Sequence, residues 1–287
     1  MDLGNGTPTS PFPSATVVML RDTAGGLEVF LLKRHGLSEV LGGAYVFPGG
    51  KVDRDDALLV DRLDQSVVDL REALGEPQLD ETHAAALYVA GIREAFEEAG
   101  VLFAAIGQDG LLDAQALHLA EGTFKAVVEG LGTPLDTASL LPWSRWVTPL
   151  NSVRARKHFD ARFFVAAVPE GQQPAHDRHE TTESVWLSPA AALREYWEGH
   201  IELAAPQIMS LTQLARFATV AEVFADARSR KPPRIQPEVF KEGGVSMVCY
   251  PGDPHHSVSA RVLPGPTRLC WRNGRYEPEG GLDSLLE

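Results

Sequence analysis

Residues 91–101 read GIREAFEEAGV, and this stretch predicts the fold around it. Glu94, Glu97 and Glu98 stand at positions i, i+3 and i+4, so on a helix all three carboxylates point the same way. Gly100 is typical of a helix end, because glycine adopts the left-handed cap conformation easily. An apolar stripe lies roughly opposite the carboxylates and consists of Tyr88, Ile92, Ala95 and Ala99. One face of this helix is therefore suited to a core, and the other concentrates negative charge.

Three carboxylates within one helical turn repel one another and tend to raise one another's pKa. A divalent cation removes that cost, and Mg²⁺ takes hard oxygen ligands and usually arrives with phosphates. The helix alone is also compatible with a solvated, glutamate-rich surface. The choice between a metal site and such a surface depends on the residues upstream.

The segment Arg93–Val101 fits the second half of the Nudix box, whose pattern is Arg-Glu-U-x-Glu-Glu-x-Gly-U, with U apolar. Residues 47–50, FPGG, resemble the opening of that box. The acid expected six positions after Gly50 is Asp56, where the family has Glu. The spacing departs further, because 36 residues, 57–92, separate Asp56 from the arginine where the family has seven.

A box interrupted in this way resembles one branch of the Nudix hydrolases, the eukaryotic peroxisomal acyl-CoA diphosphatase type and its bacterial relatives. Residues 143–149, WSRWVTP, and 159–164, FDARFF, are also similar to that branch. The resemblance covers roughly residues 14–225 and implies an α/β fold, the Nudix α/β/α sandwich with a mixed sheet. We expect a helical insertion in the Nudix box and a β-rich extension at the C-terminus.

The resemblance also implies where the chemistry lies. Mg²⁺ or Mn²⁺ would be bound by Glu94, Glu97 and Glu98 together with the carbonyl of Gly49, and one carboxylate could also serve as the base. Arg93 belongs to the same catalytic motif, but its expected role is structural, in a pair with Asp56. The residues expected to bind the substrate are Arg34, Gly50, Arg154, Arg156 and Glu183.

Several of these residues have a second interpretation. Arg34 ends a strand and could be simply solvated. The basic cluster at 154–158 could receive a phosphate in an acidic protein, or it could be an exposed loop. Glu180 or Glu183 could activate water, or both could be ordinary loop acids. The glycine pair 49–50 suits close approach of a ligand to the backbone, but it also suits a plain tight turn.

The composition limits the kind of protein. With 26 Lys and Arg against 39 Asp and Glu, the formal net charge is −13, which argues against a nucleic-acid backbone as partner. An acidic protein still suits a nucleotide substrate, because a metal ion supplies positive charge locally. No apolar run has the length of a membrane span. The two cysteines make no disulfide framework and the N-terminus does not resemble a signal peptide, so we expect a cytoplasmic protein.

Composition shifts divide the chain. Residues 1–13 are expected to be a flexible lead-in, 14–228 a Nudix domain, and 229–287 a β-rich extension packed on the domain or on a second subunit of a homodimer. The insertion, about residues 57–82, is expected to be helical. It could be a flap that shapes the substrate pocket or a surface ornament.

Periodicity and turn residues predict the individual elements. We expect a hairpin of strands at 15–20 and 27–32, helical structure at 111–129, and one helix at 204–227. Strands are expected in the extension at 245–250, 257–262 and 267–271. The adjacent histidines within 251–256 could mark a metal site, but turn residues on both sides favour a turn.

The function favoured by the sequence is metal-dependent hydrolysis of the pyrophosphate of CoA or acyl-CoA. Its products would be 3′,5′-ADP and (acyl-)phosphopantetheine. Two alternatives stay open. One is hydrolysis of another nucleotide pyrophosphate, such as NADH or ADP-ribose. The other is a Nudix-fold module that binds a ligand without turnover, although the complete set of three glutamates disfavours it.

Overall fold

The computed structural model describes residues 10–38, 41–149, 157–177 and 180–287. The predicted substrate residues Arg154 and Arg156 lie outside these ranges, as does most of the predicted lead-in 1–13. In the described part of the chain, no helix combines the length and the apolar character needed to cross a bilayer.

One mixed sheet forms the centre of the molecule, with the strand order β3-β2-β1-β6-β5-β8. In addition, β4 pairs with β1 and β7 pairs with β2. The β1–β6 and β5–β8 pairs are parallel and the other pairs are antiparallel. The strands are β1 (Phe12–Thr23), β2 (Gly26–Arg34), β3 (Tyr45–Val46), β4 (Gly49–Lys51), β5 (Leu141–Val147), β6 (Phe159–Ala167), β7 (Thr181–Leu187) and β8 (Arg234–Ile235).

The predicted hairpin is confirmed, with Thr23 paired to Gly26 across a two-residue turn. Side chains of β1 alternate between two separate hydrophobic cores, as the two-residue period of a strand requires. Val17 and Met19 pack in the core beneath α2, whereas Val18 and Leu20 pack in the core on the other face.

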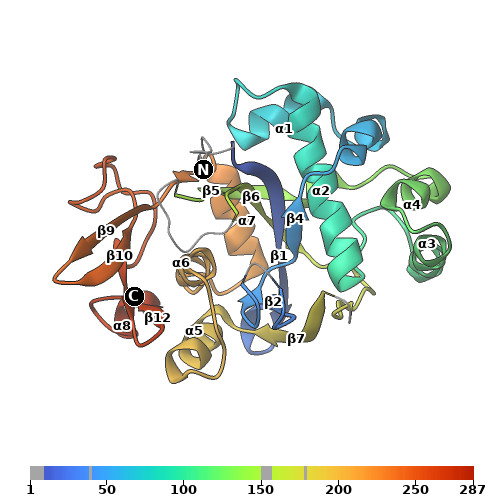
Figure 1. Ribbon diagram of the computed structural model, residues 1–287. Helices are drawn as coiled ribbons and strands as arrows, with labels where there is room; N and C mark the ends of the chain where they lie inside the picture. The colour runs from blue at the N-terminus through green and yellow to red at the C-terminus, as the bar shows by residue number, and fades with distance from the viewer. Residues whose placement is uncertain (1–9, 39–40, 150–156, 178–179) are drawn as a thin grey trace, which may run out of the picture.

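Helices cover both faces of the sheet, which confirms the α/β/α sandwich (Figure 1). One layer contains α1 (Val67–Leu74), α2 (Glu81–Ala99), α3 (Gln108–Glu121) and α4 (Phe124–Leu131). The other contains α5 (Pro189–Glu198), α6 (Ala205–Leu214) and α7 (Val220–Ser229). The two stretches predicted at 111–129 and 204–227 are helical, but 204–227 is wrong as a single helix. Each is two helices, because a second N-cap, Thr123 or Thr219, accepts a backbone N–H and starts a new axis.

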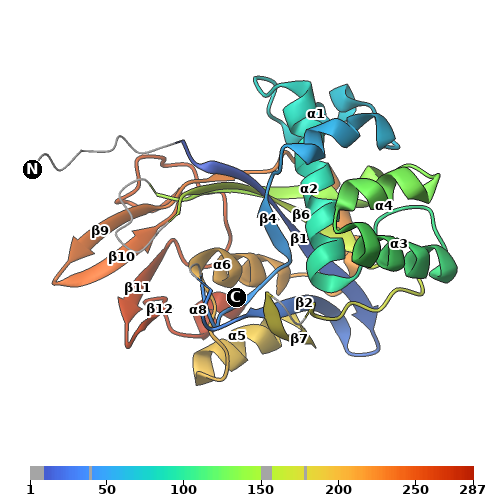
Figure 2. The ribbon, with the colours of Figure 1, turned by 45° about the vertical axis from the view of Figure 1, so that its right-hand side comes forward.

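The insertion forms a 3₁₀ helix, η1 (Asp55–Arg62), followed by α1, and it packs against α2 (Figure 2). Glu76, which follows α1 and is 7% exposed, accepts hydrogen bonds from Arg145 at 2.6 Å and from Arg162 at 2.7 and 2.9 Å. Both arginines also pair with Asp160. A buried ionic network therefore fixes the insertion to strands β5 and β6.

The C-terminal extension forms a second sheet, ordered β12-β11-β10-β9. Its strands are β9 (Glu238–Glu242), β10 (Val245–Cys249), β11 (Arg268–Arg272) and β12 (Arg275–Glu277), and α8 (Asp283–Leu286) follows them. The strand predicted at 257–262 is wrong, because these residues form bends and a loop. Tyr250 and Leu269 share one hydrophobic core with Trp143 of β5, so the extension packs on its own domain.

Two further expectations about the extension concern its cysteines and histidines. Both cysteines are buried and free, so no disulfide joins them. The predicted turn at 251–256 is present. In it, His255 stacks on Phe240 with 4.4 Å between ring centroids, and His256 lies 3.0 Å from the carbonyl oxygen of Gln236.

Candidate active site

Helix α2 presents the three glutamates in a fixed position. Asp80 caps its N-terminus by accepting the N–H of His83 at 3.1 Å, and Gly100 ends it in the left-handed conformation with φ 68°. The predicted apolar stripe is confirmed, because its four residues are no more than 1% exposed. The opposite face of α2 carries the carboxylates, and Glu98 is itself only 4% exposed.

The glycine turn lies directly against these carboxylates. The backbone N–H of Gly49 donates to Oε2 of Glu98 at 3.0 Å. A Cβ atom at Gly49 would come within 2.5 Å of the carbonyl oxygen of Ala15, and a Cβ at Gly50 would overlap the carboxylate of Glu94. Gly49 is therefore required for β4 to approach the backbone of β1 this closely, whereas a side chain at Gly50 would displace the carboxylate of Glu94.

Arg93 organises the cluster from within, and it is 7% exposed. Its guanidinium donates to both carboxylate oxygens of Asp56, at 2.9 and 3.1 Å, so the predicted pair forms despite the shorter acid and the insertion. Its Nη1 donates to Glu94 at 2.8 Å and to Glu97 at 3.0 Å. Arg93 therefore holds two of the three glutamates, which fits the structural role expected for it.

Burial perturbs two of these carboxyl groups strongly. Burial raises the pKa of Glu98 to about 8, the charge of Glu94 adds to the increase, and the Gly49 N–H and Arg34 oppose it. Burial likewise raises the pKa of Glu94 to about 7, although Arg93 opposes the increase. The pKa of Arg93 lies above its ordinary value, because the hydrogen bond to Asp56 and the neighbouring carboxylates outweigh burial. Both carboxyl groups are thus harder to ionise than ordinary glutamates while no cation is bound to them.

Arg34, at the end of β2, faces this cluster. Its Nη1 lies 3.8 Å from Oε1 of Glu98 and its Nη2 lies 3.9 Å from Oε2 of Glu180. Its Nε is buried and has no hydrogen-bond partner among the residues described. Glu183, by contrast, does not line the cavity. It pairs with Lys33 at 3.5 Å, because successive residues of β2 point to opposite faces of the sheet.

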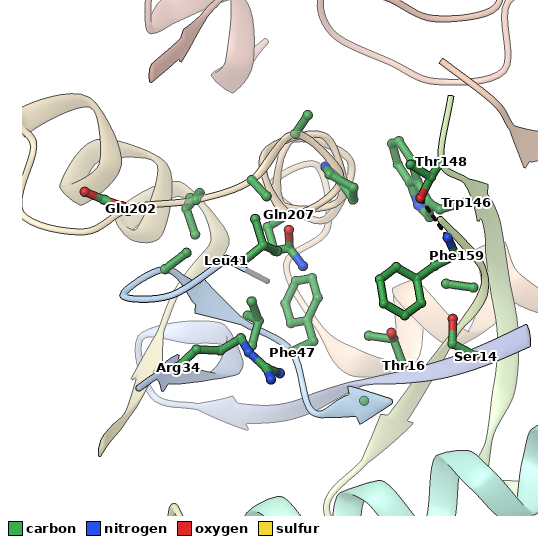
Figure 3. Close-up of a pocket in the computed structure, with 18 of the residues that line it drawn as sticks. Ser14, Thr16, Arg34, Leu41, Phe47, Trp146, Thr148, Phe159, Glu202 and Gln207 are labelled. Atoms are coloured by element: carbon green, nitrogen blue, oxygen red, sulfur yellow. Dashed lines mark hydrogen bonds between the residues drawn. The ribbon is translucent and has the colours of Figure 1, made fainter. Parts of the chain in front are cut away.

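A cavity of about 1300 Å³ is lined both by these groups and by residues of α6 and the C-terminal sheet. It begins at Glu94, Glu97 and Glu98 and passes Gly49 and Gly50. It then runs along the face of the sheet that α6 and the C-terminal sheet cover. Figure 3 shows Arg34, Thr16 and Ser14 on the strands and Gln207 opposite them on α6. Aromatic side chains occupy the space between, among them Phe47, Phe159 and Trp146.

The interpretation of the insertion as a flap of the pocket is wrong. Residues 57–82, all of which the structure describes, include none that lines the cavity. The buried contacts of Glu76 with β5 and β6 hold the insertion against these strands and α2 instead. The C-terminal extension supplies a wall of the cavity, through residues such as Val239 and Trp271. Sequence reasoning missed this wall, since an apolar residue of a short strand has no local signal of what it faces.

The donor set of the glutamate cluster fits a divalent cation. Three carboxylates crowd one helical turn beside a backbone turn, and two of them are buried with raised pKa values. Hard oxygen ligands of this kind suit Mg²⁺ or Mn²⁺. Among the described residues, the group whose possible ligand atoms all lie within 4.8 Å of one another is Glu195, Glu198 and His200 at the C-terminal end of α5, whereas the three glutamates of α2 are more widely spaced. It is largely exposed and His200 already pairs with Glu195 at 2.9 Å, which is typical of a charged helix end.

A mixed sheet between two helical layers, with three glutamates of α2 held against a glycine turn, defines a Nudix hydrolase. The model of the NUDT19 Nudix domain matches residues 69–214, half of the chain, and the chain belongs to this family. The match begins after the glycine turn, inside the insertion, and includes α2 and strands β5 to β7.

Relatives and a solved structure agree with this assignment. The chain is 27% identical to nudix hydrolase 7 of Caenorhabditis elegans, over 98% of this chain and 92% of the relative. It is 27% identical to the acyl-coenzyme A diphosphatase NUDT19 of Xenopus laevis, over 68% of this chain but only 62% of that protein. A crystal structure of a NUDIX hydrolase from Alicyclobacillus acidocaldarius superposes with a TM-score of 0.62 at 26% identity, covering 78% of this chain and 98% of that one.

Proposed function

We propose that this protein hydrolyses the diphosphate of CoA or of acyl-CoA, with Mg²⁺ or Mn²⁺, to 3′,5′-ADP and (acyl-)phosphopantetheine. The observation that carries the proposal is one continuous cavity, lined in one part by the glutamates and Arg34 and in another by apolar side chains. An acyl-CoA has the same division, because its charged diphosphate is joined to a long arm that ends in an acyl group. The similarity to acyl-coenzyme A diphosphatases supports the same substrate class.

The glutamates would hold the metal together with the carbonyl of Gly49. A divalent ion held there would supply positive charge to the diphosphate and help to prepare water for attack. The protein's own part is to keep the ligands in place. Arg93 holds Glu94 and Glu97, and the N–H of Gly49 holds Glu98. These contacts limit the movement of the ligands, so that little reorganisation is needed during the reaction.

Arg34 would bind a phosphate oxygen of the substrate. Its Nε lacks a partner among the described residues, and its contacts with Glu98 and Glu180, at 3.8 and 3.9 Å, are longer than hydrogen bonds. An anionic oxygen would satisfy these donors through charge-assisted hydrogen bonds. Glu180, whose side chain is 66% exposed at the cavity, is the candidate outside α2 for accepting a proton from water.

The test is a substrate panel containing CoA, acetyl-CoA, decanoyl-CoA, NADH and ADP-ribose, each with Mg²⁺ and with Mn²⁺. Products are identified by mass. We expect 3′,5′-ADP from the CoA substrates and the highest kcat/KM among them. Faster cleavage of NADH or ADP-ribose than of any CoA species would refute the proposal.

A further inference from the structure

We propose that the C-terminal sheet, together with strands β5 and β6, forms a binding compartment for the acyl chain of the substrate. This proposal rests on the proposed function and names the residues that would select among acyl-CoA substrates. The compartment is the apolar part of the cavity, and its principal lining residues are Trp146, Phe159, Phe163, Val239, Val248 and Trp271.

The inner wall of the compartment is aromatic. Trp146 is 5% exposed, and its indole N–H is satisfied by Oγ of Ser144 at 3.1 Å. Its ring lies 6.2 Å from the ring of Phe163, and the ring of Phe47 packs edge-on against Phe163 at the same centroid distance. Because the polar atom of Trp146 is bonded to the protein, the cavity meets only the apolar surface of the ring.

The outer wall comes from the C-terminal sheet. Val239 of β9 pairs directly with Val248 of β10, so their side chains form one apolar patch on the same face. Both residues line the cavity, as does Trp271 of β11. With the aromatic inner wall on one side and this outer wall on the other, an aliphatic chain in the compartment would contact apolar side chains on both sides.

The outer wall is anchored to the rest of the domain. Tyr196 of α5 donates its hydroxyl to the carbonyl oxygen of Tyr276 at 2.6 Å. Arg275 donates to the carbonyl oxygens of Tyr196 and Trp197 at 3.0 and 2.7 Å. Strand β8 continues the connection by pairing Ile235 with Trp146. The compartment is therefore preformed, so an acyl chain would not have to order it on binding.

A polar group marks the route from the diphosphate to this compartment. Gln207 of α6 lines the cavity and is 6% exposed, and its Oε1 has no hydrogen-bond partner within the described ranges. Figure 3 shows its amide between α6 and Phe47. A buried acceptor without a partner destabilises the free protein, and an amide N–H of a bound ligand would satisfy it. The pantetheine arm, which joins the diphosphate to the acyl group, carries two such amides.

The size of the cavity agrees with such an occupant. Cavities for drug-sized ligands usually measure about 300–1,000 Å³, and this cavity measures about 1300 Å³. The space therefore exceeds what a single compact nucleotide needs. Each methylene removed from water improves affinity by at most about fourfold. Lengthening an acyl chain from six to ten carbons adds four methylenes and should then tighten binding by up to about 200-fold.

The experiment measures binding without hydrolysis. Acyl-pantetheines with two, six and ten acyl carbons, which carry no phosphate, are titrated by calorimetry into the metal-free protein below their micellar concentrations. We expect affinity to rise steeply with chain length in the wild type. Val239→Trp fills the compartment and should remove the dependence on length. Lys241→Trp places the same ring on the same strand at an exposed position outside the cavity lining, and should retain it.

Gln207→Met provides an independent check, because methionine has a similar shape but lacks the acceptor. This substitution should weaken the binding of all three acyl-pantetheines by the same factor, about 2–10-fold for one hydrogen bond. Affinity that does not depend on chain length in the wild type, or a Val239→Trp protein that still discriminates, would overturn the proposal. A wild type that binds in this way but hydrolyses no CoA species would refute the proposed function and leave the compartment supported.

Discussion

The pair between Arg93 and Asp56 allows a sharp test of how the site is held, through the substitution Asp56→Asn. Asp56 is 1% exposed, and it accepts two hydrogen bonds from Arg93 and a third from the N–H of Asp53 at 2.7 Å. An asparagine keeps one acceptor oxygen, but its NH₂ group must face one of these donors. The substitution therefore removes at least one charge-assisted bond and leaves Arg93 without its buried counter-ion.

The magnitude follows from these losses. A charge-assisted hydrogen bond contributes about 1.5–3 kcal/mol, and breaking a buried ion pair costs about 3–5 kcal/mol. Since Arg93 keeps Glu94 and Glu97 as partners, we expect a loss near the lower bound, about 3 kcal/mol. For a chain of this size that corresponds to a decrease in Tm of about 5–10 °C. Turnover should also decrease, because Arg93 would hold the metal ligands less rigidly.

Asp53→Asn is the matched control for stability. Asp53 is also near Arg93, but the distance is 3.9 Å and its side chain is 70% exposed. Exposed pairs contribute little, so we expect a change in Tm of no more than about 2 °C. Calorimetric scans of the wild type and both variants at one scan rate would provide the comparison. Equal decreases in Tm for the two variants would show that the buried pair does not hold the site.

The remaining predictions concern the metal, pH and the substrate. Exhaustive chelation should abolish turnover, and Glu98→Gln should nearly abolish it while the circular dichroism spectrum stays that of the wild type; near-wild-type rates would contradict the ligand assignment. The pKa of Glu98 is raised from 4.5 to about 8, so the folded metal-free protein binds more protons than the unfolded chain. The free energy of unfolding of the metal-free protein should therefore decrease as pH rises from about 4.5 to 8. In thermal melts recorded in chelator, Tm should decrease less with pH for Glu98→Gln than for the wild type. CoA should exceed 3′-dephospho-CoA in kcat/KM by about 10–100-fold, the effect of one charge-assisted phosphate contact. Lys157 belongs to the basic cluster and lines the cavity, so we expect it to contact the 3′-phosphate. Lys157→Gln should reduce the ratio of kcat/KM for CoA to kcat/KM for 3′-dephospho-CoA.

Local signals in the sequence were sufficient to predict helix α2. The spacing of Glu94, Glu97 and Glu98 and the helix end at Gly100 are properties of adjacent residues, and the structure contains both. The pairing of Arg93 with Asp56 crosses the insertion, yet the motif predicted it. The break at Thr219 also had a local signal, because Thr219 and Glu222 have the spacing of a helix N-terminus.

The walls of the cavity had no such signal. Val239 and Trp271 stand far along the chain from Trp146, and only tertiary packing brings them to one space. The position of the insertion was equally hidden, since Glu76 reads as a turn acid in the sequence. Its burial becomes visible only when Arg145 and Arg162 arrive from strands β5 and β6. Contacts between distant segments decide both features, and periodicity within one segment does not report them.

The C-terminal sheet shares a hydrophobic core with β5, and this has a practical consequence for truncated forms of the protein. The family match ends at residue 214, and a truncation there would delete α7, strand β8 and the whole second sheet. The side chains of Trp143 and Trp146 would then lose Ile235, Tyr250 and Leu269 from their surroundings. A Nudix fragment that ends at residue 214 would thus expose an apolar aromatic surface to water. Aggregation of such a fragment would say nothing about the intact chain.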